Sequence, residues 1–224
     1  MFYRRGVGRV RTRVKICGLT RADEACTAAR LGADAVGLVF HDASPRGVDV
    51  ATARGIRSLL PPFVTVTALF MDAPEQRVRH VLDGVAIDLL QFHGGEDAAY
   101  CESFSRPYIK VVPMADGADP HALMARHPNA AGFVLDGHGA GEQGGSGRVF
   151  DWSSVPSSPE RPIVLAGGLH PGNVAMAVRQ ANPWAVDVSS GVESAPGIKD
   201  ARRMASFISE VQGVQDVRGN AAVD

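Results

Sequence analysis

Short apolar runs alternate along the chain with longer segments in which apolar residues stand three or four positions apart. Within each run, successive residues are apolar, which is typical of strands that are covered on both faces. The expected strands span residues 14–17, 35–40, 64–70, 87–92, 108–112, 132–135, 163–166 and 185–188. The intervening segments, such as DEACTAARLGA and EQRVRHVLDGV, have helical spacing, and several begin with Asp, Pro or Ser as helices often do. The pattern therefore predicts alternating strands and helices.

Strands that are buried on both faces and joined by helices form a parallel sheet with right-handed crossovers. An open, doubly wound sheet has about five or six strands, whereas about eight strand–helix units in a chain of 224 residues fit a closed barrel. The predicted fold class is therefore α/β, a (β/α)8 TIM barrel in a single domain. We place this barrel domain at residues 13–211, between a basic N-terminal tail at 1–12 and a C-terminal tail at 212–224.

Composition narrows the class of protein further. Hydrophobic residues make up 45% of the chain and charged residues 21%, and no apolar run approaches the roughly 18 residues that a membrane span needs. The three cysteines, Cys17, Cys26 and Cys101, are odd in number and have no C-x-x-C spacing, so we expect neither a disulfide framework nor a zinc site. These features favour a cytoplasmic protein without a membrane partner.

The arginines at the start of the chain raise the question of nucleic acid. Five of them stand in the first 13 residues without an acidic residue: Arg4, Arg5, Arg9, Arg11 and Arg13. Such a segment could be a nucleic-acid arm or an organellar address, but the other 18 of the 23 basic residues are outnumbered by 24 acidic ones. One short arm on an acidic body makes a poor surface for a phosphate backbone. We therefore interpret the segment as a frayed basic tail and expect no nucleic-acid partner.

The carboxyl ends of the strands, with the loops that follow them, build the active site in a barrel of this kind. Reactive or polar residues, or glycines that could bind a ligand through their backbone, stand there in six of the eight expected units: Cys17, Arg46, His93, Asp136, Gly168, and the group Asp187, Ser190 and Gly191. Because all the strand ends meet at one rim, we expect these residues to surround a common site.

Cys17 and Asp136 are the candidate catalytic pair, although each also has an ordinary structural interpretation. A free cysteine is usually buried packing, but at the open end of a strand a thiolate can act as a nucleophile or a base. An aspartate before a glycine-rich loop is usually a turn residue, but a carboxyl that loses water has a raised pKa and becomes a general acid. The loop at residues 137–147, GHGAGEQGGSG, is expected to close over this mouth. Cys26 and Cys101 fall in predicted helices and are expected to pack there.

The last two strands point to a phosphorylated ligand. Gly168, Ser190 and Gly191 follow them, at the place where barrels often bind phosphate on backbone N–H groups, although these residues could also be simple tight turns. The GGSG run lacks the G-K-[ST] ending of a nucleotide-binding loop. A small phosphorylated molecule is therefore a better candidate than a nucleoside triphosphate.

The remaining polar candidates suit substrate binding. Arg46 is either a solvated surface charge or a partner for a carboxylate or an aromatic ring. His93 and Asp187 are candidates for orienting a substrate. His93 stands close to Glu96 and Asp97, but this spacing matches no established ligand motif, so we expect no metal.

From about Val14 to about Phe207 the sequence resembles the phosphoribosylanthranilate isomerase family. The matching segments are VKICGLT, GADAVGLVF, SPR, LPPFV, QFHGGE, LDG with GGSGRVFDW, LAGGLHPGNV and VDVSSGVESAPGIKD. There are two departures. LLQFHGG has an aromatic residue where an aliphatic one is common, and LAGGL lacks a serine near the expected phosphate.

The resemblance implies an Amadori rearrangement of N-(5-phosphoribosyl)anthranilate to 1-(2-carboxyphenylamino)-1-deoxyribulose 5-phosphate in tryptophan biosynthesis, without cofactor or metal. It implies that Cys17 is the general base and Asp136 the general acid. The substrate-binding residues it implies are Arg46, His93 and Asp187, and the phosphate-binding residues are Gly168, Ser190 and Gly191.

Two alternative functions stay open at this point. One is another phosphosugar barrel, an isomerase or epimerase, and the cysteine at the end of the first strand argues against it. The other is a non-catalytic barrel that binds a phosphorylated ligand, and the presence of both Cys17 and Asp136 counts against that. We expect a monomer rather than a homodimer, because no long exposed apolar stretch calls for a partner.

Overall fold

The computed structural model describes residues 11–114, 119–137, 150–156 and 160–220, with side chains up to residue 214. Eight parallel strands form a closed barrel in chain order, and the first pairs with the last. The strands are β1 (Arg13–Cys17), β2 (Ala35–Val39), β3 (Thr65–Phe70), β4 (Leu89–Phe92), β5 (Tyr108–Pro113), β6 (Gly132–Asp136), β7 (Ile163–Leu165) and β8 (Ala185–Val188). The predicted (β/α)8 fold is confirmed, and each expected strand ends within two residues of an observed one.

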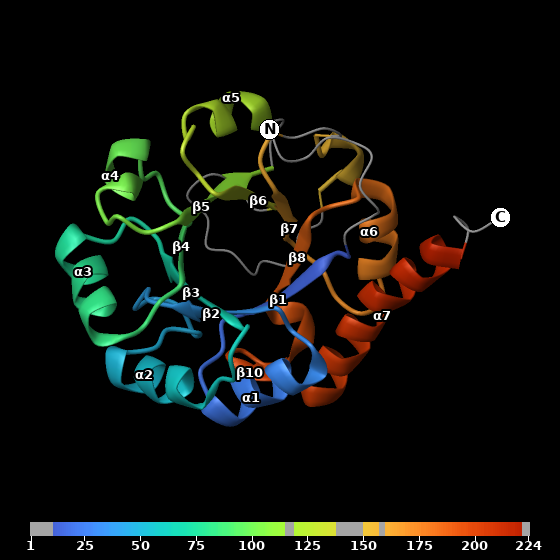
Figure 1. The fold of residues 1–224 in the computed structure, drawn as a ribbon, viewed down its shortest axis with the longest axis horizontal. Helices are drawn as coiled ribbons and strands as arrows, with labels where there is room; N and C mark the ends of the chain where they lie inside the picture. Colours follow the sequence, from blue (N-terminus) through green and yellow to red (C-terminus); the bar gives the residue numbers. More distant parts are fainter. Residues whose placement is uncertain (1–10, 115–118, 138–149, 157–159, 221–224) are drawn as a thin grey trace.

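Helices surround the barrel on its outside (Figure 1). They are α1 (Ala22–Leu31), α2 (Val50–Leu59), α3 (Glu75–Gly84), α4 (Ala98–Glu102), α5 (Pro120–Ala125), α6 (Val174–Ala181) and α7 (Ala201–Asn220). Between β6 and β7, the described residues form a short 3-10 helix, η2 (Trp152–Ser154). A second one, η3 (Ser190–Val192), follows β8 and leads into a small hairpin of β9 (Glu193–Ala195) and β10 (Ile198–Lys199).

Local sequence signals fix several helix ends. Asp49, Asp97 and Asp119 precede α2, α4 and α5, and each side chain accepts a hydrogen bond from a backbone N–H in the first turn. These bonds satisfy donors that the helix itself leaves without a partner. Gly32 ends α1 with a φ of 100°, a left-handed conformation that glycine adopts without steric cost. Local sequence therefore sets where these four helices begin or end.

The strand side chains form two layers of core because successive residues of a strand point to opposite faces. Ile16 and other outward residues pack between the strands and the helices. Val111 and Val134 belong to a second, smaller cluster that fills the inside of the barrel. Lys15 and Cys17 stand on either side of Ile16 in β1, so both face the barrel interior.

The last helix extends the barrel beyond the limit expected from the sequence. α7 runs to Asn220, and Val211 and Val214 are both buried. It packs against α1 and α6, so the division placed after residue 211 falls inside a continuous helix. At the other end, Thr12 is buried, and residues 1–10 of the basic tail lie outside the described residues.

In the part of the chain that the structure describes, we find no helix with the length and hydropathy to cross a membrane.

Candidate active site

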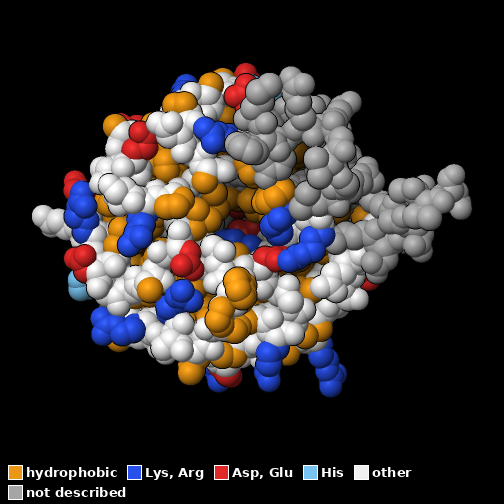
Figure 2. Space-filling view, viewed as in Figure 1, with side chains coloured by type: hydrophobic (Ala, Val, Ile, Leu, Met, Phe, Trp, Pro, Cys, Tyr) orange, Lys and Arg blue, Asp and Glu red, His pale blue; other side chains and the backbone are white. Residues whose placement is uncertain are grey.

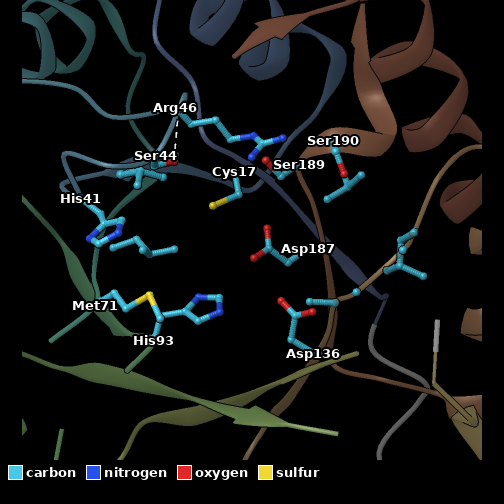
Figure 3. Close-up of a pocket in the computed structure, with 17 residues that line it drawn as sticks. Cys17, His41, Ser44, Arg46, Met71, His93, Asp136, Asp187, Ser189 and Ser190 are labelled. Carbon is cyan, nitrogen blue, oxygen red and sulfur yellow. Dashed lines mark hydrogen bonds between the residues drawn. The ribbon is translucent and has the colours of Figure 1, made fainter. Parts of the chain in front are cut away.

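A pocket opens at the carboxyl ends of the barrel strands, where Figure 2 shows a hollow with hydrophobic side chains around it and acidic and basic side chains inside. Figure 3 shows Cys17, Asp136 and Asp187 turned toward this space from β1, β6 and β8. The site residues expected from the sequence that line the pocket are Cys17, Arg46, His93, Asp136, Gly168, Asp187 and Ser190. Gly191 is not among the lining residues.

Cys17 ends β1 and is followed by Gly18, whose φ of 73° turns the chain sharply away from the strand. Its neighbour across the sheet is Gly37 of β2, and a Cβ at Gly37 would lie only 2.6 Å from the sulfur. The glycine therefore makes room for the thiol in the barrel mouth. Burial raises the pKa of Cys17 most strongly, while Lys15 acts in the opposite direction by charge attraction and a hydrogen bond.

Lys15 is a residue of the site that the sequence analysis missed. Its Nζ lies 2.7 Å from Oδ2 of Asp187, and both side chains are buried. The two residues are opposite each other in the pairing of β1 and β8. The signal that could have found Lys15 is its position two residues before Cys17, because strand residues two apart share a face. A lysine within an apolar strand and on the same face as Cys17 points to a charge inside the barrel.

Asp136 ends β6. It is buried, and it lines the pocket. Gly167, after β7, has a φ of 80°, and a Cβ there would lie 2.9 Å from Oδ1 of Asp136. A glycine at this position thus lets the loop after β7 pass beside the carboxyl. Of the expected lid at 137–147, all but Gly137 lies outside the described residues.

Arg46 lies in the loop after β2, and its guanidinium forms a two-point ion pair with Glu193 at the start of β9. Lys199 of β10 also donates to Glu193, at 2.7 Å. Burial raises the pKa of Glu193, but the hydrogen bonds from Arg46 and Lys199 outweigh it and leave the pKa lowered. Arg46 is therefore not the solvated surface charge that was one of its two interpretations. Glu193 and Lys199 were not among the candidates expected from the sequence.

The loops after β7 and β8 meet at one side of the pocket. Gly167 and Gly168 both have left-handed φ values, 80° and 62°. The side chain of Asn173 donates to the carbonyl of Gly168 at 2.9 Å and so braces this turn. Gly191 sits against the neighbouring loop, because a Cβ there would lie 1.9 Å from the carbonyl oxygen of Leu169. Gly191 thus allows the two loops to approach closely, although it does not line the pocket itself.

Glu96 and Asp97, which follow His93 closely in the sequence, form hydrogen bonds outside the pocket. Glu96 accepts hydrogen bonds from the backbone N–H groups of Asp72 and Gly94 and pairs with Lys110 at 3.1 Å. Asp97 caps α4.

The cysteines Cys26 and Cys101 lie on α1 and α4, the first partly exposed and the second fully buried.

A closed parallel barrel with a thiol, two carboxyls and an arginine at its carboxyl-end mouth defines a (β/α)8-barrel enzyme. Residues 14–210 match the family model described as N-(5'phosphoribosyl)anthranilate (PRA) isomerase. The chain belongs to this family.

Similar proteins cover nearly the whole chain. An N-(5'-phosphoribosyl)anthranilate isomerase of Halorhodospira halophila is 51% identical over 203 residues, which are 91% of this chain and 98% of that protein. A phosphoribosyl anthranilate isomerase of Thermus thermophilus has a crystal structure that matches with a TM-score of 0.82 and 33% identity, over 91% of this chain and 100% of that one. A second structure, of a phosphoribosyl anthranilate isomerase in complex with reduced 1-(o-carboxyphenylamino)-1-deoxyribulose 5-phosphate, matches with a TM-score of 0.79 and 34% identity, over 90% and 99% of the two chains.

Proposed function

We propose that the chain catalyses the Amadori rearrangement of N-(5-phosphoribosyl)anthranilate to 1-(2-carboxyphenylamino)-1-deoxyribulose 5-phosphate, a step of tryptophan biosynthesis. The observation that carries this proposal is the meeting of Cys17 and Asp136 in one pocket, from strands on different sides of the barrel. Such a rearrangement needs an acid and a base placed around one sugar. Membership of the isomerase family favours this reaction over another phosphosugar conversion or a binding function.

The two residues divide the chemistry between them. Asp136 protonates the ring oxygen of the ribose, so that the ring opens and the nitrogen forms a Schiff base with C1. Cys17, as the thiolate, removes the proton from C2, and the electrons left on C2 neutralise the imine to give an enolamine. Tautomerisation of the enolamine gives the ketone product. Each proton transfer by a positioned side chain contributes about 10²- to 10⁴-fold in rate.

The pocket offers complementary groups for the two ends of the substrate. Arg46 binds the carboxylate of the anthranilate part, since a guanidinium pairs well with a planar carboxylate. His93 and Asp187 line the space between and orient the sugar. The phosphate lies at Gly168, Ser190 and Gly191, where backbone N–H groups and the Ser190 hydroxyl are the donors. Cofactor and metal have no part in this scheme.

Assembly and location belong to the same proposal. We infer a monomer, because no long exposed apolar stretch of the sequence calls for a partner. The exposed apolar side chains of the chain include Leu59 and Phe63, at the far end of the barrel from the pocket. A dimer could cover these two side chains, and light scattering of the purified protein distinguishes it from a monomer. A cytoplasmic location is supported by three free cysteines.

The test follows the loss of fluorescence of N-(5-phosphoribosyl)anthranilate generated in situ. We expect turnover by the unmodified protein and its loss in Cys17→Ala. Cys26→Ser is the matched control, because Cys26 lies on α1 outside the pocket. An unmodified protein without turnover would contradict the proposed reaction, and a Cys17→Ala variant with full turnover would contradict the assignment of the base.

A further inference from the structure

The Lys15–Asp187 ion pair lies inside the barrel, at the base of the pocket that Asp187 lines. The side chains are 6% and 7% exposed. Desolvating two charges is costly, and apolar residues of similar size often stabilise a protein as well as a buried ion pair does. Several inward-facing residues of the other strands are apolar, including Ile109, Val111 and Val164. Packing therefore does not call for a charge here, and the proposed reaction gives Lys15 no role.

Lys15 lies beside the sulfur of Cys17. The two residues are two positions apart on β1 and share a face of the strand. Gly37 faces both of them from β2, and a Cβ built there would lie 2.6 Å from the sulfur and 3.1 Å from Nζ of Lys15. A single point this close to both atoms places the ammonium next to the thiol. Because an ammonium has three N–H donors, Lys15 can bind Asp187 and Cys17 together.

Opposing charges act on the ionisation of Cys17. Burial raises its pKa, Lys15 and Lys199 lower it, and Asp187 raises it. The other titratable or charged side chains that line the pocket are His41, Arg46, His93 and Asp136. Burial lowers the pKa of Lys15 itself, but the attraction of Asp187 and Cys17 outweighs this and leaves it raised. The raised pKa of Lys15 thus favours its positively charged form beside the thiol.

We propose that Lys15 is a positioning residue that stabilises the thiolate of Cys17, and that Asp187 holds Lys15 in place and moderates its effect. When the thiol releases its proton to water in the pocket, an N–H of Lys15 donates to the sulfur. When the sulfur later takes the C2 proton of the substrate, it becomes a neutral thiol and Lys15 stays paired with Asp187. This rests on the proposed role of Cys17 as base, but the ionisation can be measured without substrate.

The test measures the rate at which iodoacetamide alkylates Cys17 across a pH range, followed by mass spectrometry of the peptide that carries Cys17. The thiolate reacts and the thiol does not, so the midpoint of the profile reports the ionisation of this residue. In Lys15→Met we expect the midpoint to rise by at least about one pH unit. In Asp187→Asn we expect it to fall, because the carboxylate is lost while the ammonium stays.

Lys110→Met is the matched control. Lys110 is a buried lysine paired with a carboxylate, Glu96, but it stands between two inward-facing residues of β5 and so faces away from the barrel interior. We expect this variant to lose stability and to keep the alkylation midpoint of the unmodified protein. A shift in this control would show that breaking any buried ion pair disturbs the thiol.

The opposite directions of the two shifts separate this role from a structural one. An unchanged midpoint in Lys15→Met, or shifts of the same sign in both variants, overturns the proposal. If Lys15→Met does not fold, Asp187→Asn decides alone, and an unchanged or raised midpoint overturns it. Full turnover by Cys17→Ala would overturn the proposed function instead, whereas the alkylation profiles would still report on Lys15.

Discussion

Arg46 and Glu193 are 147 residues apart in the chain, and Nε and Nη2 of the arginine each lie 2.8 Å from an oxygen of the glutamate. The pair joins the loop after β2 to the hairpin after β8, with 13% and 5% of the two side chains exposed. Two donors of the planar guanidinium are therefore fixed on Glu193. In the proposed function the Nη1 edge meets the carboxylate of the substrate, and the direction of this edge is set by Glu193 rather than by the flexible arginine stem.

This geometry predicts that Glu193→Gln weakens substrate binding. The amide keeps the size of the side chain but loses the negative charge that fixes the orientation of the Arg46 guanidinium. We expect KM to rise by about tenfold, equivalent to ~1.4 kcal/mol, with a much smaller change in kcat. Steady-state kinetics measure both. Glu75→Gln is the control, since Glu75 makes an exposed ion pair with Arg79 on α3 and should leave KM unchanged. An unaltered KM in Glu193→Gln would show that Arg46 needs no partner.

Glu193 also predicts how acid affects stability. Its pKa is lowered in the folded protein, so its contribution to stability is present above its unfolded pKa and is lost as pH falls through the folded value. Urea unfolding at pH 7 and at successively lower pH measures this loss. We expect the stability difference between the unmodified protein and Glu193→Gln to shrink below about pH 4.5, the usual pKa of a glutamate. A difference that stays constant down to pH 3 would contradict it.

The sequence predicted the strands and the rim residues because both depend on local order. Cys17 and Asp136 could be placed at the pocket from their positions at strand ends, since every parallel strand of a barrel ends at the same rim. Lys15, Glu193 and Lys199 could not be placed in the same way. Lys15 meets Asp187 and Glu193 meets Arg46 over 172 and 147 residues of chain, and which charges meet over such distances depends on strand register and loop packing, on which a single sequence carries no direct signal. Glu193 and Lys199 are only six residues apart, but they meet in the β9–β10 hairpin, which the expected strands did not include.

The end of α7 and the surroundings of Gly191 also depend on contacts between distant segments, which the local sequence pattern does not indicate. Val214 is buried because α7 packs against α1 and α6, and nothing in the local pattern after residue 211 indicates those neighbours. Gly191 was expected to border the ligand. In the structure its missing side chain makes room for the carbonyl of Leu169, a tertiary contact that the sequence does not indicate, and the backbone N–H of Gly191 stays a proposed phosphate donor.

Asp136→Asn removes the proposed acid without changing the size of the side chain. We expect kcat to fall by about 10²- to 10⁴-fold while KM changes little, because the amide cannot give up a proton to the ring oxygen. Asp49→Asn is the control, since Asp49 caps α2 and asparagine caps a helix about as well. Stopped assays with enough enzyme to detect slow turnover measure the residual rate. A loss of less than about tenfold would remove Asp136 from the role of acid.

Gly37→Ala tests whether the space beside the thiol matters for activity. The added Cβ would lie 2.6 Å from the sulfur of Cys17, closer than such atoms approach, so the sulfur and Lys15 must move. We expect kcat to fall about 10²-fold, because moving a reacting atom by about 1 Å costs roughly that much in rate. Gly55→Ala is the control, since nothing lies within 4 Å of a Cβ there. On the surface of α2 that change should raise stability by up to about 1 kcal/mol and leave kcat alone. Thermal unfolding and turnover, measured on both variants, separate the two effects, and normal turnover in Gly37→Ala would show that Cys17 tolerates displacement.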